Sequence, residues 1–287
     1  MLSYEEALAR LLAACEPVSP VDLPLAEAAG LALAGDLAAR LTQPPFPASA
    51  MDGYAVRWTD MPGPWRVIGE SAAGRGFDGK VDAGETARIF TGAPLPEGAD
   101  TVIVQEEVGR EGDLLTLTGE GPPHTGAHVR KAGKDFSAGE RLIAAGTRLS
   151  PQHLGLAAAS GHGSLAVRRP RVAIIATGDE LVPPGETPQA DQIVSSNGVM
   201  LAALFRAAGT EARDLGIFPD DLDAIGKGLR AASDADLVVT IGGASVGDHD
   251  LVQAALKDAG AALDFWKVAI KPGKPLILAI VAGKPVI

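Results

Sequence analysis

Short apolar runs alternate with segments of helical pattern in the last part of the chain. The apolar runs have the length of strands and lie at Arg171–Thr177, Ala212–Ile217, Leu237–Ile241 and Phe265–Ile270. Helices are expected between them, at Gly198–Ala208, Leu222–Ala231 and Leu251–Ala259. This β-α-β-α-β-α-β alternation predicts a parallel sheet with helices on both faces, so we interpret residues 170–287 as an α/β domain.

Residues 56–142 show a different pattern, in which short β-like runs are separated by clusters of glycine, proline and aspartate. The runs lie at Trp65–Ile68, Ala87–Phe90, Thr101–Val104 and Leu114–Leu117. Such spacing is typical of an all-β module. The proline-rich link Gln43–Pro47 precedes it and marks a boundary. We therefore predict an inserted, mostly-β domain at residues 45–141.

The remaining segments have a mixed pattern and are interpreted as two parts of one small linking domain. Ser3 and Glu6 form a capping box, which predicts an N-terminal helix. Further helices are expected at Leu25–Leu33 and Pro151–Ala159. The first part of the linking domain, with the N-terminal helix, is placed at residues 1–44 and the second at 142–169. The expected fold class is therefore multidomain, α/β plus β.

Composition narrows the possible classes of function. A net charge of −11 and an aromatic content of 4% argue against nucleic-acid binding, because phosphate backbones attract basic surfaces and bases stack on aromatic rings. The single cysteine, Cys15, excludes an intrachain disulfide, and its apolar surroundings predict a core position. No apolar run approaches the roughly 18 residues that span a bilayer, and the acidic N-terminus lacks signal-peptide features. We therefore expect a cytoplasmic protein without membrane contact.

Polar residues follow each predicted strand of the α/β domain, where parallel sheets bind ligands. These segments are TGDE at 177–180, PDD at 219–221, GGASVGDHD at 242–250, and Lys267, Lys271 and Lys274 around a Pro-Gly turn. The glycine-rich turn lets backbone N–H groups approach an anion, and lysines neutralise it. The acids that could hold a hard cation such as Mg²⁺ are Asp179, Glu180, Asp220, Asp248 and Asp250. Each piece alone is typical of a surface turn, but together they indicate a phosphate or oxyanion site.

Seven segments, in this order, resemble the molybdopterin molybdenumtransferases, the family of MoeA and the gephyrin E domain. They are PFPASAMDGYAV (45–56), FTGAPLPEGAD (90–100), VRKAGKDF (129–136), ATGDEL (176–181), SSNG (195–198), GGASVGDHD (242–250) and FWKVAIKPGKPL (265–276). The resemblance implies insertion of molybdate into adenylated molybdopterin, with Mg²⁺-dependent release of AMP. It also implies an elongated homodimer, with a cleft between the sheet domain of one subunit and the β module of the other. A molybdopterin adenylyltransferase would act upstream, and molybdoenzyme chaperones are further expected partners.

The resemblance also implies the roles of individual residues. The implied catalytic residues are Asp52, Asp135, Glu180, Asp220, Asp250, Lys267 and Lys271. The implied substrate-binding residues are Thr91, Thr177, Gly178, Asp179, Ser196, Asn197, Gly242, Gly243, Ser245, Gly247 and Lys274. Asp220 and Asp250 are the implied Mg²⁺ ligands.

The sequence departs from the family pattern in two places. The family has Ser-Gly-Gly-Val-Ser where this chain has Ile241-Gly242-Gly243-Ala244-Ser245. After Ile287 the family continues with a Gly-Leu-Pro-Gly-Asn-Pro-Val-Ser loop and a small C-terminal β domain, so we interpret the sequence as truncated at its C-terminus. We expect these residues to retain pterin binding more readily than full turnover.

Two other functions remain open from the sequence. One is a non-catalytic molybdopterin-binding or scaffold protein on the same fold, which the retained acids and lysines argue against. The other is the related molybdopterin adenylyltransferase, in which the inserted β domain and the paired lysines are not expected. A dinucleotide-binding protein is disfavoured because no G-x-G-x-x-G follows the strand at Arg171.

Overall fold

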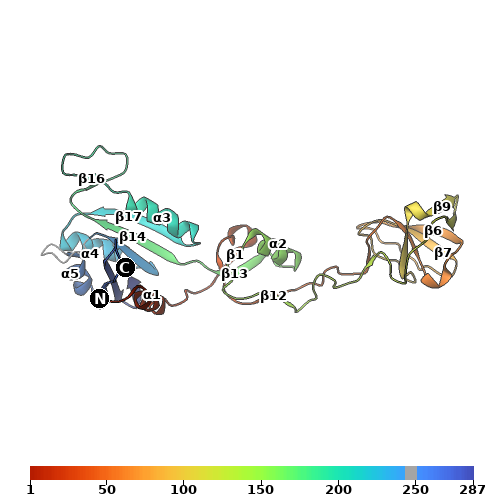
Figure 1. Ribbon diagram of the computed structural model, residues 1–287, viewed down its shortest axis with the longest axis horizontal. Helices are drawn as coiled ribbons and strands as arrows, with labels where there is room; N and C mark the ends of the chain where they lie inside the picture. The colour runs from red at the N-terminus through yellow and green to blue at the C-terminus, as the bar shows by residue number, and fades with distance from the viewer. Residues whose placement is uncertain (243–250) are drawn as a thin grey trace. The chain divides into compact units, whose positions relative to one another are not determined.

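The computed structural model describes residues 1–242 and 251–287 (Figure 1). The chain divides into two compact units. Unit 1 comprises Met1–Asp36, Ala144–Leu154 and Ser164–Ile287, and unit 2 comprises Leu37–Ile143 and Gly155–Gly163. The expected combination of an α/β fold with a β-rich insertion is confirmed, whereas the finer division into four segments stays a prediction.

A six-stranded sheet with the order β17-β14-β18-β21-β20-β19 forms the centre of unit 1. Its strands are β14 (Arg171–Thr177), β17 (Glu211–Phe218), β18 (Leu237–Ile241), β19 (Ala262–Lys267), β20 (Pro275–Val281) and β21 (Lys284–Val286). The expectation of a wholly parallel sheet was wrong, because β20 runs antiparallel to both of its neighbours. The turns on either side of β20 are too short for a parallel crossover. The last expected strand also lies earlier, at 262–267 instead of 265–270.

Helices cover both faces of this sheet, as expected. Alternate residues of β14 point to opposite faces, so Val172 and Ile174 enter one core while Ala173 and Ile175 enter the other. The first core receives α3 (Asn197–Ala207), and the second receives α4 (Leu222–Ala231) and α5 (Leu251–Asp258). Helix α1 (Tyr4–Ala13) packs through Ala7 on Phe265 and Leu278. Figure 1 shows these helices on the two sides of the sheet.

The helix starts in unit 1 are set by different side chains. The capping box of α1 is confirmed, with the Glu6 N–H donating to Ser3 Oγ at 3.1 Å and the Ser3 N–H to Glu6 Oε2 at 2.9 Å. At the start of α3, by contrast, the Ser196 side chain makes no capping hydrogen bond. The carboxylate of Asp214 lies beside the first turn of α3, so close that a Cβ on Gly198 would meet Asp214 Oδ2 at 2.4 Å.

Near the N-terminus a small sheet replaces an expected helix. β1 (Val21–Pro24), β13 (Ser164–Arg168) and β2 (Ala32–Leu33) form a three-stranded sheet in the order β1-β13-β2. The helix expected at Leu25–Leu33 was wrong, because only a 3₁₀ turn at Leu25–Glu27 forms before the chain pairs with β13. Gly30 ends that turn with a φ of 77°. Cys15 was expected in the core but is exposed, since α1 ends at Ala13 and its buried face does not extend that far.

Unit 2 contains a six-stranded sheet in the order β8-β5-β7-β6-β10-β9. Its strands are β5 (Gly53–Val56), β6 (Trp65–Ser71), β7 (Glu85–Ile89), β8 (Thr101–Val104), β9 (Val108–Glu111) and β10 (Leu114–Leu117). The four expected runs are confirmed, and β5 and β9 were missed. Trp65, Ile103 and Leu115 fill the core of this sheet.

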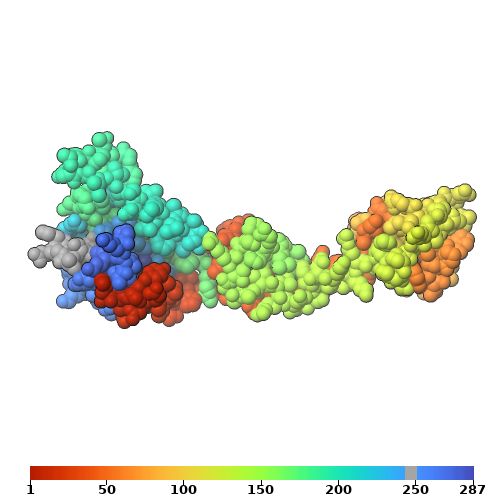
Figure 2. Space-filling model, in the orientation of Figure 1, coloured from red at the N-terminus to blue at the C-terminus, as the bar shows by residue number. Residues whose placement is uncertain are grey.

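The remaining elements are short. Three two-stranded pairs complete the fold, namely β3 (Leu37–Ala38) with β12 (Arg141–Ile143), β4 (Ala48–Ser49) with β11 (Val129–Arg130), and β15 (Leu181–Val182) with β16 (Ile193–Val194). Helix α2 (Pro151–Ala159) forms as expected, and 3₁₀ turns lie at Trp58–Asp60 and Gln105–Glu107. The segment with β15 and β16 projects from the body of unit 1 (Figure 2). Within the described residues, no helix has both the length and the apolar character of a membrane span.

Candidate functional site

The strand ends of unit 1 bring predicted site residues to one edge of the sheet. β14, β17, β18 and β19 run in the same direction, so their carboxyl ends lie at the same edge, where β20 begins. We call the residues there the strand-end edge, which comprises residues 177–180, 219–221, 242 and 267–274. β20 runs opposite to β21, and β19 runs opposite to β20, so β19 again has the direction of the parallel strands. Its carboxyl end therefore lies at the same edge as theirs.

The ends of β14 and β18 approach each other unusually closely. Gly242 has a φ of +100°, and a Cβ at this position would lie 2.4 Å from the Thr177 carbonyl oxygen and 2.8 Å from Thr177 Oγ1. Only glycine fits this position without a shift of the backbone. The Thr177 hydroxyl is buried and, within the described part of the chain, has no hydrogen-bond partner. A buried hydroxyl without a partner can form one more hydrogen bond, for example with a ligand.

The loops after β14 and β17 are tied together. The Gly178 N–H donates to the Phe218 carbonyl at 3.3 Å, and the Asp220 N–H donates to Asp179 Oδ1 at 3.1 Å. Asp221 is used differently, because its carboxylate accepts the Ala224 N–H at 2.9 Å and caps α4. These bonds hold the backbones of the two loops against each other.

Two carboxylates at the strand-end edge have no hydrogen-bond or ion-pair partner among the described residues. Across residues 1–242 and 251–287, neither the Glu180 nor the Asp220 side chain forms a hydrogen bond or ion pair, and both residues are exposed. Glu180 folds back beneath Gly178, where a Cβ would meet Glu180 Oε2 at 2.5 Å. Its carboxylate therefore lies directly beside the end of β14. No group of three or more His, Cys, Asp or Glu side chains that could enclose a metal occurs in the same described ranges.

The positive charges at this edge come from β19 and the turn that follows it. Lys267 is half-buried, with its Nζ 4.4 Å from the centre of the Trp266 ring, whereas Lys271 and Lys274 are exposed. None of the three lysines pairs with a carboxylate of the residues that the structure describes. Their charge is thus available to an anion.

A cleft of about 330 Å³ opens at the same edge. Asn197, Thr240, Gly242, Pro275 and Ile287 are among the residues that line it. The cleft therefore joins predicted residues at the start of α3 and the end of β18 to the residue after Lys274. Ser196 lies outside its lining and is exposed.

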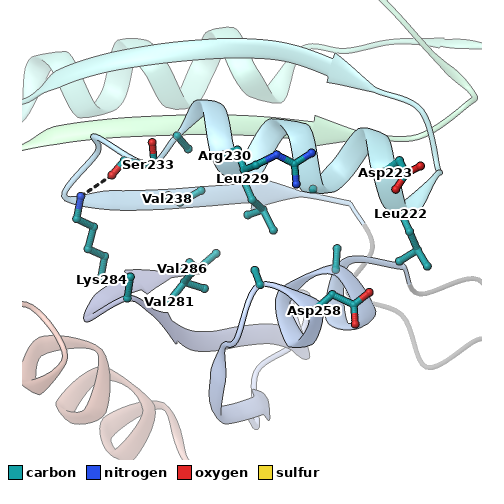
Figure 3. Close-up of a pocket in the computed structure, with 15 residues that line it drawn as sticks. Leu222, Asp223, Leu229, Arg230, Ser233, Val238, Asp258, Val281, Lys284 and Val286 are labelled. Atoms are coloured by element: carbon teal, nitrogen blue, oxygen red, sulfur yellow. Dashed lines mark hydrogen bonds between the residues drawn. The ribbon is translucent and has the colours of Figure 1, made fainter.

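A larger hollow of about 550 Å³ lies elsewhere in unit 1, between α4, α5 and the β20–β21 hairpin (Figure 3). Its floor is apolar and includes Leu229, Val238 and Val286. Lys284 lines it with its aliphatic stem, because its Nζ donates to the Ser233 carbonyl at 2.6 Å. None of the predicted site residues lines this hollow, so we assign the chemistry to the strand-end edge.

In unit 2, Asp52 and Thr91 form a second predicted group. Asp52 precedes β5 and Thr91 follows β7, and the Thr91 N–H and Oγ1 both donate to Asp52 Oδ1, at 2.8 and 2.9 Å. These bonds, the backbone bond first, lower the pKa of the Asp52 carboxyl below its ordinary value, with a smaller contribution from Arg88. Asp52 is therefore ionised at neutral pH and held in one orientation.

Arg88 is a feature of this corner that the sequence reasoning missed. Its guanidinium lies 5.1 Å from the Tyr54 ring centre and 4.8 Å from that of Phe90. It also donates to the Gly53 carbonyl at 3.1 Å and to the Gln105 side chain at 2.5 Å. The cross-strand pair of Tyr54 and Arg88 could have indicated this contact, but only if β5 had been predicted.

Some of the predicted site residues belong to neither of these two groups. Asp135 is exposed in unit 2, where its N–H donates to the Gln43 carbonyl at 3.0 Å and its carboxylate has no partner among the residues described. Gly243, Ser245, Gly247, Asp248 and Asp250 lie outside the described residues.

Comparisons with known proteins match two family models to consecutive parts of the chain. Residues 2–161 match the family model of the MoeA N-terminal region (domain I and II), and residues 173–287 match that of a probable molybdopterin binding domain. A molybdopterin molybdenumtransferase 2 of Mycobacterium tuberculosis is 38% identical over 99% of this chain and 72% of its own length. A molybdopterin molybdenumtransferase of Haemophilus influenzae is also 38% identical, over 96% of this chain and 69% of its own.

Solved structures show the same similarity at the level of the fold. A crystal structure of a molybdopterin biosynthesis moeA protein from Pyrococcus horikoshii matches all of this chain and 73% of its own, with a TM-score of 0.86 and 33% identity. A further crystal structure of a molybdopterin biosynthesis moeA protein, from Pyrococcus horikoshii OT3, matches with a TM-score of 0.82 and 31% identity.

Proposed function

Because the chain belongs to the molybdopterin molybdenumtransferase family, we propose that it acts in molybdenum cofactor biosynthesis and inserts molybdate into adenylated molybdopterin with release of AMP. Support comes chiefly from the strand-end edge, where two carboxylates and three lysines form no ion pair among the described residues. The lysines suit a phosphoanhydride and an oxyanion, and the carboxylates suit a divalent cation.

The lysines and glycines bind the anionic parts of the substrates in this proposal. Lys271 and Lys274 are exposed and unpaired among the described residues, so they attract molybdate and the phosphates without first breaking an ion pair. Gly242 removes side-chain bulk at the end of β18, and the Thr177 hydroxyl offers one more hydrogen bond there. Attack of water on the adenylyl phosphorus breaks its bond to the bridging oxygen, so that AMP forms and the molybdopterin phosphate leaves. Attack by a molybdate oxygen would instead give an adenylyl–molybdate anhydride, which water must then hydrolyse to AMP and molybdate. Neither route needs a covalent protein nucleophile.

Mg²⁺ fits the donor set at this edge, because it prefers one or two carboxylates together with ligand phosphates. Asp220 is the described residue that would hold it, and Asp250, the second ligand that the family resemblance implies, lies outside the described residues. When bound, the ion neutralises phosphate charge on the anhydride. Asp179 holds the Asp220 loop, and Glu180 is available to orient the attacking water.

Unit 2 contributes three site residues in this proposal, namely Asp52, Thr91 and Asp135. The two bonds from Thr91 occupy Asp52 Oδ1, so Oδ2 remains available for a substrate group. Arg88 holds the adjacent backbone through the Gly53 carbonyl. In this proposal the protein is a cytoplasmic homodimer that receives its substrate from a molybdopterin adenylyltransferase and passes its product to molybdoenzyme chaperones.

AMP release from adenylated molybdopterin tests the function directly. Purified protein with Mg²⁺ is expected to release AMP faster when molybdate is added, and Glu180→Gln and Asp220→Asn should abolish that stimulation without changing Tm. Asp258→Asn, a change of an exposed acid at the end of α5, serves as the charge-matched control. Tight binding of the substrate without release would restrict the role to a molybdopterin-binding protein. ATP-dependent adenylation of free molybdopterin would point to the adenylyltransferase instead.

A further inference from the structure

The acids at the strand-end edge differ in what their carboxylates contact. Asp221 caps α4 through the Ala224 N–H, and Asp179 accepts the Asp220 N–H at 3.1 Å. The carboxylates of Glu180 and Asp220 form no hydrogen bond or ion pair within the described residues. Of the four acids at these two strand ends, Glu180 and Asp220 therefore keep both carboxylate oxygens free of hydrogen bonds within the described residues, whereas Asp179 and Asp221 each use one.

The hydrogen bond between Asp179 and Asp220 acts on a loop that backbone hydrogen bonds and the Asp221 cap also hold. The Asp221 N–H donates to the Pro219 carbonyl at 2.8 Å, which makes a tight turn around Asp220. The Gly178 N–H reaches the Phe218 carbonyl at 3.3 Å one step earlier. Among the residues described, the Asp179 carboxylate provides the only side-chain hydrogen bond to the backbone of Asp220 itself.

We propose that Asp179 is a positioning residue, whose carboxylate holds the Asp220 backbone so that the Asp220 carboxylate is presented to the Mg²⁺ of the substrate complex. This rests on the proposed function, in which Asp220 is a Mg²⁺ ligand. It changes the role expected of Asp179, which the family resemblance had placed among the residues that touch substrate. Groups that orient a metal ligand through a hydrogen bond affect metal affinity without contacting the metal.

The proposal separates the geometry of Asp179 from its charge. An asparagine at this position keeps a carbonyl oxygen that can accept the Asp220 N–H, but it has no negative charge. A positioning role therefore tolerates asparagine and does not tolerate alanine. A direct role in binding Mg²⁺ requires the charge and would be lost in both variants.

Two measurements on Asp179→Asn and Asp179→Ala test this, with Asp258→Ala as a control for the loss of an exposed acid. The first is hydrogen exchange of the Asp220 amide, followed by NMR in the full chain without ligand. The second is binding of Mn²⁺, a paramagnetic substitute for Mg²⁺, in the presence of AMP, followed by electron paramagnetic resonance. Asp179→Asn should remain within about twofold of the wild type in both, whereas Asp179→Ala should expose the amide and bind Mn²⁺ about tenfold more weakly.

Equal loss of Mn²⁺ affinity in both variants, with the Asp220 amide still protected in Asp179→Asn, would overturn the proposal and make Asp179 a ligand. Unchanged exchange and affinity in Asp179→Ala would overturn it as well. If the wild-type protein bound no Mn²⁺ with AMP, the proposed function would fail. The amide exchange, which needs no substrate, would still show whether Asp179 holds the Asp220 loop.

Discussion

Replacing Thr177 by valine is expected to make the free protein more stable and to make it bind its ligand more weakly. Thr177 is only 4% exposed, and its Oγ1 has no hydrogen-bond partner in the described part of the chain. A buried hydroxyl without a partner costs about 1–3 kcal/mol in desolvation. Valine has nearly the same shape and is equally compatible with the last position of a strand, so this penalty disappears without a cavity being created.

The expected gain is about 1 kcal/mol in the free energy of unfolding, at the lower end of that range because neighbouring groups relax. In a domain of about 150–250 residues this raises Tm by about 2–4 °C. The opposite sign is expected for ligand binding, because a hydrogen bond to a charged group is worth about 1.5–3 kcal/mol. AMP affinity in the presence of Mg²⁺ should therefore fall by at least about tenfold.

Thr210 provides a matched control. Its Oγ1 is also buried and without a partner in the described residues, and it lies in unit 1, at the end of the sheet opposite to the strand-end edge. Thr210→Val should therefore stabilise the protein to a similar extent and leave AMP binding unchanged. Thermal denaturation and titration calorimetry on the two variants separate the effects. A Thr177→Val protein that loses more than about 1 kcal/mol of stability would refute the reasoning, since the hydroxyl would then have a partner in the free protein.

The remaining predictions concern one glycine and one carboxylate. Gly242→Ala should destabilise unit 1 by about 2–4 kcal/mol, because it adds a steric clash with the Thr177 carbonyl to the strain of a positive φ. Gly260→Ala is the control, because Gly260 has a φ of +78° and nothing within 4 Å of a Cβ, so that only the backbone strain is added. Its free energy of unfolding, measured by urea denaturation, should fall by about 1 kcal/mol. Equal losses in the two variants would mean that movement of the backbone relieves the clash at Gly242. Thr91→Val should raise the pKa of Asp52, since it removes the side-chain donor and keeps the backbone donor. The folded-state pKa of Asp52 lies below its ordinary value of 3.8, so the ionised carboxylate stabilises the fold above that pH, and this contribution is lost as the pH falls through the folded-state pKa. The Tm difference between wild type and Thr91→Val should therefore be present at pH 6 and vanish in strong acid, and a difference that persisted in acid would assign it to packing.

Local elements of this protein follow from short stretches of sequence. The structure confirms the bounds of β18 (Leu237–Ile241) and α4 (Leu222–Ala231) as predicted, because each is delimited by polar or turn-forming neighbours. The capping box at Ser3 forms as its residues predict. The convergence of 177–180, 219–221 and 267–274 at one edge also follows from the sequence, since strands that share a direction end on the same side of a sheet.

Other features depend on partners that are distant in the chain. The direction of β20 is set by its short turns and by pairing on both sides with β19 and β21. The segment Leu25–Leu33 has a helical pattern, but pairing of its last residues with β13 replaces the helix with a strand. Propensity is a weak preference, and hydrogen bonding to an available sheet edge outweighs it.

Only the tertiary structure shows which contact each acid of the strand-end edge makes. The sequence places Asp179, Glu180, Asp220 and Asp221 at two strand ends and predicts their chemistry, because carboxylates beside lysines suit a metal–phosphate ligand. It does not show that Asp221 caps a helix, that Asp179 holds the next loop, or that Arg88 lies between two aromatic rings near Asp52. Residue types and their order determine which groups reach a site, but hydrogen-bond partners are chosen by distances of about 3 Å that arise only when separate strands pack together.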